Sequence, residues 1–148
     1  MTEVKARLAP AEPEPFVIHW YRAEPGWLEQ DTDSAFNRHV GHSWNPVNWF
    51  DFLAKVVETE PVVVRGSLEF SLKPFAKALK SYGLIATEWG DGPTDGLGAM
   101  TGAWWCDEEA AKLGKPLREM ELMQDIASYN EVDCKVMMEI VRHLRAYH

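Results

Sequence analysis

The chain has 148 residues, of which 46% are hydrophobic and 26% charged, a composition typical of one globular domain with a sizeable buried core. Its net charge of −8 excludes a surface that is basic throughout, so any contact with nucleic-acid phosphates must come from a local patch. No apolar run approaches the roughly 20 residues needed to span a bilayer. Two cysteines without CxxC spacing argue against a disulfide scaffold and indicate a reducing, cytoplasmic compartment.

Proline and charged residues dominate Met1–Pro15, which we therefore expect to be a flexible lead-in. Residues 16–148 contain no internal repeat, and we assign them to one domain. Seven tryptophans are many for this length. We expect most of them in the core, and stacking on nucleic-acid bases is the alternative.

The first half of this domain mixes strand and helix signals. The extended apolar run Phe16–Tyr21 predicts a buried strand, and Glu24-Pro25 predicts a helix entry because proline suits a first turn. Asn45 is a suitable N-cap for apolar residues at helical spacing, which predict a helix that ends near Glu60. The β-branched run "PVVVRG" that follows predicts a short strand.

The second half is richer in helix signals. Apolar spacing predicts a helix over Leu72–Tyr82 that Gly83 terminates. The glycine-rich stretch Thr87–Trp105 predicts a long loop that is either functional or poorly ordered, and Asp107–Gly114 predicts a short helix with Asp107 as its cap. A last, long helix is expected from about Leu117 to Tyr147. Two short strands among several helices indicate a mixed α/β domain.

An acid interrupts the apolar stripe of this last helix. Asp133 lies four residues after Tyr129, so both side chains point the same way. An ionised carboxylate removed from water costs several kcal/mol unless it is paired or holds a metal. A carboxylate that holds Mg²⁺ beside a tyrosine that orients water suits phosphodiester chemistry. The alternative is a narrow apolar arc with Asp133 at its margin, beside Lys135.

Several motifs occur in the order of a known nuclease superfamily. The run "YNEVD", ending at Asp133, resembles the third motif, Y-x-x-x-D, of DEDD-type 3′–5′ exonucleases of the RNase H-like fold. The run "HWYRAE" resembles the second motif, H-N-x-x-F-D, with His19 matching, Glu24 in the aspartate position, and Trp20 and Ala23 replacing Asn and Phe. Between them, "WFDFLAKVV" and "FSLKPFAKAL" resemble the D-L-L … S-L-K stretch of a bacterial, largely uncharacterised branch.

This resemblance implies Mg²⁺- or Mn²⁺-assisted hydrolysis of a DNA or RNA phosphodiester, with water as the nucleophile. It implies that Asp133 and Glu24 bind metal, that Tyr129 positions the water, that His19 supports catalysis and that Asn130 contacts the substrate. The family's first motif, D-x-E on the opening strand, supplies two of its four metal-binding carboxylates, and it is missing from this chain before the first predicted strand. The chain would thus hold the helix-rich C-terminal part of an RNase H-like α/β domain, completed by an N-terminal half elsewhere. The alternative is a non-catalytic nucleic-acid-binding or assembly module.

Three lysines share one face of the helix predicted over residues 72–82. Lys73, Lys77 and Lys80 have i, i+4, i+7 spacing and suit contact with a nucleic-acid backbone, whereas a solvated lysine face is the alternative. A sheet without its first strands would expose an edge, which predicts self-association or a partner chain.

Overall fold

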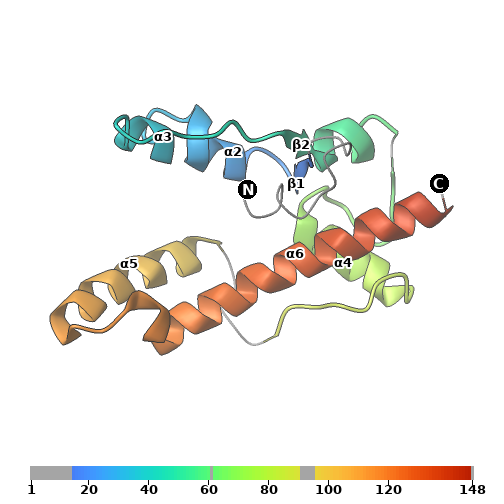
Figure 1. Cartoon of the computed structure of the whole chain (residues 1–148). Coiled ribbons are helices and arrows are strands. Elements are labelled where there is room, and N and C mark those ends of the chain that lie inside the picture. The colour runs from blue at the N-terminus through green and yellow to red at the C-terminus, as the bar shows by residue number, and fades with distance from the viewer. Residues whose placement is uncertain (1–14, 61, 91–95, 148) are drawn as a thin grey trace. The chain divides into compact units, whose positions relative to one another are not determined.

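The computed structural model describes residues 15–60, 62–90 and 96–147 (Figure 1). Except for Pro15, the lead-in expected over Met1–Pro15 lies outside the described residues. Contacts divide the chain into two compact units, with the boundary directly after Leu72. Each unit is described by itself.

The first unit contains a two-stranded parallel sheet. Strand β1 (Val17–His19) pairs with β2 (Trp49–Asp51), so that His19 lies opposite Asp51 in the register. Strand β1 confirms the first predicted strand. The helix predicted from Asn45 is wrong over its first part, because the apolar run that includes β2 is compatible with either period and forms a strand.

The first unit also contains several short helical turns. They are α2 (Ala23–Pro25), the π-helical turn η1 (Gly26–Gln30), α3 (Ala35–Arg38) and the π-helical turn η2 (Leu53–Val57). The helix entry predicted at Glu24-Pro25 is confirmed by α2. The second strand, predicted from the run "PVVVRG", is wrong for the part that is described, because residues 62–65 have no sheet partner there.

The core of the first unit is built around Trp20, which follows β1 directly. Its indole lies 6.0 Å from the ring of Phe52, and its N–H donates a hydrogen bond of 2.8 Å to the carbonyl of Phe70. Leu53 and Val57 of η2 are also buried. These contacts fasten the end of β1 to segments far away in the sequence.

The second unit is helical in its described part. It comprises α4 (Leu72–Ser81, from Lys73 on), α5 (Gly96–Leu113), the 3₁₀ turn η3 (Leu117–Glu119) and α6 (Glu121–Tyr147). The structure confirms α4 and the last helix, although α6 begins four residues later than predicted. Gly83 follows α4 with a φ of +68°, a left-handed conformation that suits glycine and confirms the predicted stop.

Helix α5 corrects two predictions. The loop expected over Thr87–Trp105 is wrong from Gly96 onward, and Asp107 lies inside α5 instead of capping a short helix. Glycine here serves packing, because a Cβ added at Gly102 would lie only 3.2 Å from the side chain of Leu122 and 3.3 Å from that of Ile126. Helices α5 and α6 therefore approach closely at this point.

The apolar face of α6 supplies much of the second unit's core. Its buried side chains are Ile126, Val136, Ile140, Val141 and Leu144. Of the two thiols, Cys106 in α5 is fully buried and Cys134 in α6 is exposed. The mixed α/β class is confirmed, and in the described part of the chain no helix has the length and apolar character to cross a bilayer.

The expectation of a tryptophan-rich core is wrong for three of the seven tryptophans. Trp27, Trp104 and Trp105 are exposed, and of these Trp104 retains 76% of its accessible surface. Trp20 is buried, and Trp89 is half-buried beside α6. The partly accessible indole of Trp89 belongs to the candidate site described below.

Candidate functional site

Asp133 is half-buried on α6, and a tryptophan contacts its carboxylate. The indole N–H of Trp89 donates a hydrogen bond of 2.7 Å to Oδ1 of Asp133. Trp89 belongs to the segment that follows α4, more than forty residues earlier in the chain. Oδ2 of Asp133 receives no hydrogen bond from the described residues. Asp133 thus has one oxygen held by a hydrogen bond, Oδ1, and one that is available to a ligand, Oδ2.

A lysine supplies the cation that the sequence led us to expect. The ammonium of Lys73 lies 4.6 Å from the ring centre of Tyr129 and 5.7 Å from that of Trp89. Its charge also acts on Asp133. The prediction that Tyr129 and Asp133 share one face is therefore confirmed. Lys135, the alternative partner of Asp133, pairs with Glu131 instead, at 2.6 Å.

The pKa of Asp133 shows that burial of this carboxyl outweighs the Trp89 hydrogen bond and the charge of Lys73. Burial raises the pKa of this carboxyl above its ordinary value of 3.8, while the Trp89 N–H and the charge of Lys73 lower it only in part. The ionised form is thus under-solvated in the folded protein. A carboxylate that a fold retains at such a cost is a candidate for function.

The segment that carries Trp89 is fastened to α6 at a second acid. Glu139 accepts hydrogen bonds from the backbone N–H groups of Ala86 (2.7 Å) and Thr87 (3.0 Å), and from the Thr87 hydroxyl (2.7 Å). The Thr87 bonds are the largest of the influences that lower the pKa of Glu139. Lys80 adds a bond of 3.0 Å to the carbonyl of Ala86. Residues 86–89 are therefore held in place beside α6.

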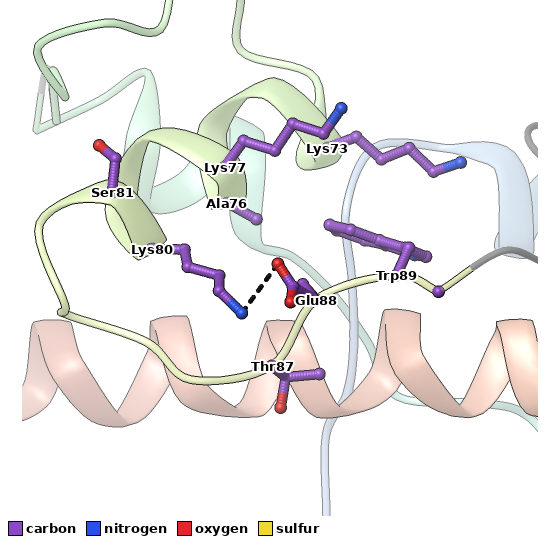
Figure 2. Close-up of a pocket in the computed structure, with 9 residues that line it drawn as sticks. Lys73, Ala76, Lys77, Lys80, Ser81, Thr87, Glu88 and Trp89 are labelled. Carbon is purple, nitrogen blue, oxygen red and sulfur yellow. Dashed lines mark ion pairs between the residues drawn. The ribbon is translucent and has the colours of Figure 1, made fainter.

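A pocket of about 420 Å³ lies between α4 and this segment (Figure 2). All three lysines of the predicted lysine face line it, together with Trp89 and Glu88. Lys80 is paired with Glu88 at 2.9 Å, as the dashed line in Figure 2 marks. Lys77 is exposed and forms no ion pair with any described residue. The face is thus not merely solvated, since it forms one wall of a cavity.

The other predicted site residues lie elsewhere. His19 is buried in β1, where its Nδ1–H donates to the carbonyl of Tyr21 and its ring meets Trp49 edge-on at 5.5 Å. Glu24 is exposed in α2, and Asn130 is exposed in α6. Because His19 and Glu24 belong to the first unit and Asp133 to the second, a metal site shared by them stays a prediction.

The backbone between these two first-unit residues is strained. Tyr21 has a φ of +79°, which makes it the one non-glycine residue with positive φ in the described part of the chain. Such a conformation costs on the order of 1–3 kcal/mol and persists only where neighbouring contacts enforce it. Its carbonyl bond with His19 and the 5.7 Å approach of the Arg22 guanidinium to its ring are contacts of this kind.

A metal would find one clear ligand in the second unit. Within the described ranges, no three or more His, Cys, Asp or Glu side chains gather into a group that could hold a metal ion. Asp133 would be one ligand of an Mg²⁺ or Mn²⁺ site, through Oδ2, and does not form such a site by itself. Mg²⁺ commonly binds one or two carboxylates and completes its shell with water and substrate phosphates.

Trp89 is not among the site residues predicted from the sequence. Its only signal is its position in the aromatic, glycine-rich segment predicted to be a functional or poorly ordered loop, and nothing in the linear pattern links it to Asp133.

No protein-family model matches the chain, and it has no significant similarity to a curated protein or to a solved structure. The exonuclease resemblance and the RNase H-like fold therefore stay predictions.

Proposed function

We propose that this chain is part of a nuclease of the DEDD exonuclease type, with an RNase H-like fold, and that it acts on DNA or RNA. The observation that carries the proposal is the half-buried carboxylate of Asp133. It is retained on the same face as Tyr129, with its pKa raised by burial, beside a pocket lined by lysines. Carboxylates with a raised pKa in such surroundings are over-represented at functional sites.

Each side chain of the site would have a distinct role. Oδ2 of Asp133 would bind the divalent ion, which when bound polarises a phosphate and lowers the pKa of coordinated water. Lys73 and Lys77 would attract and neutralise the phosphates of the strand. Tyr129 would direct its hydroxyl at the attacking water, and the Lys73 ammonium over its ring limits where that ring can lie.

One carboxylate does not complete a two-metal site. Further oxygen ligands would come from acids of a complementing N-terminal half, either in a longer chain or in a partner. This requirement also supports the expectation of an oligomer or a complementing partner. Asn130, exposed one residue after Tyr129, would contact the strand from α6.

A second candidate function is a nucleic-acid-binding or assembly module without catalysis. The hydrogen bond from Trp89 to Oδ1 favours it, because that bond gives Asp133 a role within the protein itself. Lys77 and the pocket would serve binding equally well without hydrolysis.

The substitution Asp133→Asn tests the proposed function. Asparagine removes the charge that binds metal, but its carbonyl oxygen can still accept the Trp89 hydrogen bond, so the fold should be retained. We expect cleavage of fluorescein-labelled single-stranded DNA or RNA, in Mn²⁺ or Mg²⁺, to fall by about 100-fold or more. The full chain is assayed alone and together with any complementing half.

The matched control is Asp125→Asn, the same change at an exposed acid on the same helix. It should leave cleavage unchanged. Normal cleavage by the Asp133→Asn variant would refute the proposal. Binding of the oligonucleotides without cleavage in either metal, by the unaltered chain together with a complementing half, would establish the second candidate instead.

A further inference from the structure

The pocket beside α4 has the size and walls of a small-molecule site. Its volume of about 420 Å³ lies within the range of roughly 300–1,000 Å³ that is usual for such sites. Lys73, Ala76 and Lys77 of α4 form one wall, and Thr87–Gly90 form the other (Figure 2). Because Glu139 and Lys80 fasten the second wall, the pocket is formed before any ligand arrives.

The charge of the pocket favours an anion. Lys80 is balanced by Glu88 at 2.9 Å, and the charge of Lys73 acts on the carboxylate of Asp133. Lys77 has no such partner among the described residues and lines the pocket from an exposed position. In a protein with a net charge of −8, this makes the pocket a local positive site that suits one phosphate group.

The opposite wall offers an aromatic ring. Trp89 lines the pocket, and its hydrogen bond to Asp133 fixes the plane of the indole. Figure 2 shows this ring across the pocket from the lysines of α4. Aromatic side chains of this kind stack on nucleic-acid bases, and each base must be unpaired to offer its face.

We propose that this pocket binds one nucleotide of a single-stranded nucleic acid, with its phosphate at Lys77 and its base against Trp89. The inference rests on the proposed function for the substrate class alone. Asp133 does not line the pocket, but Trp89 both lines it and donates to Asp133, so the indole connects a bound nucleotide to the candidate carboxylate. Because a base must be unpaired to stack on this ring, the pocket would favour single strands.

Titration of the full chain with thymidine monophosphate tests this inference. The solution contains EDTA, so that metal-dependent cleavage plays no part, and the indole N–H signals are followed by NMR. The Trp89 signal is assigned by its absence in Trp89→Phe. We expect it to shift on titration, and we expect Lys77→Gln to weaken binding about tenfold, the loss of one charge-assisted contact.

Three comparisons make the result specific. Lys115→Gln removes a charge from another exposed lysine of the second unit and should leave affinity unchanged. Thymidine without phosphate, and inorganic phosphate without base, should each bind more weakly than the nucleotide. Trp89→Phe keeps an aromatic ring and should retain more affinity than Trp89→Leu, in a chain whose other indole signals show it to be folded.

Either of two results overturns the inference. One is an equal affinity of Lys77→Gln and the unaltered chain for the nucleotide, and the other is inorganic phosphate binding as tightly as the nucleotide. Failure here is distinct from failure of the proposed function. A chain that binds the nucleotide in EDTA but never cleaves, even together with a complementing half, refutes hydrolysis alone. Cleavage that depends on Asp133, with binding indifferent to Lys77, refutes the pocket alone.

Discussion

Two acids on α6, Asp133 and Glu139, touch the same segment and differ in how they are stabilised. Glu139 accepts three hydrogen bonds from Ala86 and Thr87, and these bonds lower its pKa. Asp133 accepts one, from Trp89, and burial raises its pKa. The folded protein thus stabilises the charge of one acid and opposes the charge of the other.

This difference separates a structural acid from a candidate functional one. Glu139 fastens residues 86 and 87 to the helix, so its value to the fold is evident from its bonds. Asp133 adds little to the fold for the burial it requires, and a directly bound divalent cation would stabilise it better than the Trp89 N–H and the Lys73 charge do. Sites where a fold tolerates such a cost are where function is expected.

The largest effect on stability is expected from Glu139→Ala. It removes three hydrogen bonds to a charged acceptor, and we expect a loss of about 1–2 kcal/mol after allowance for partial exposure. Urea unfolding measures the change, and Glu139→Gln, which keeps one acceptor oxygen, should lose less. A Glu139→Ala variant as stable as the unaltered chain would mean that the segment is held by other contacts.

A smaller and opposite effect is expected from Asp133→Asn. Asparagine resembles the neutral acid, so at pH 7 the variant should be as stable as the unaltered chain, or more stable by up to about 1 kcal/mol. Because the folded pKa of Asp133 is raised, its protonation stabilises the fold as pH falls through that value. The difference in stability between Asp133→Asn and the unaltered chain should therefore close toward pH 4.

The pH dependence of Glu139 has the other sign. Its folded pKa is lowered, so its contribution is present above the ordinary value of 4.5 and is lost as pH falls through the folded pKa. Thermal unfolding of Glu139→Ala, of Asp133→Asn and of the unaltered chain, between pH 3 and pH 7, measures how the contribution of each acid to stability changes with pH. These changes are the two slopes to be compared. Slopes of the same sign would remove the distinction between the two acids.

The smallest effect is expected from Glu131→Gln. Glu131 is fully exposed and pairs with Lys135 one helical turn away, at 2.6 Å. Exposed pairs of this kind contribute little, so the melting temperature should change by less than about 1 °C. A larger change would show that any charge on α6 affects stability, whether or not it is buried or hydrogen-bonded. Burial and hydrogen bonding would then not explain the difference between Asp133 and Glu139.

Strong helical periodicity made α4 and α6 predictable from sequence. Their apolar stripes recur over nearly three turns in α4 and over more in α6, and Gly83 marks the end of α4, where the left-handed backbone favours glycine. Strand β2 was mistaken for helix because a short apolar run fits both periods. Helix α5 was missed because its glycines suggest a loop, whereas Gly102 permits close contact with α6.

The candidate site was predictable only in its local part. The spacing of Tyr129 and Asp133 fixes their shared face, and the i, i+4 spacing places Lys73 and Lys77 together. What brings Lys73 over Tyr129, and Trp89 onto Asp133, is tertiary packing across more than forty residues. No local pattern encodes such a pairing.

The two thiols differ in accessibility, and this allows selective chemical labelling next to the candidate site. Cys106 is fully buried in α5, so reagents in water do not reach it, whereas Cys134 is exposed directly after Asp133. A maleimide dye added to the native protein therefore attaches at one position without mutagenesis. Its emission would then register the arrival of an ion or a strand at the neighbouring carboxylate.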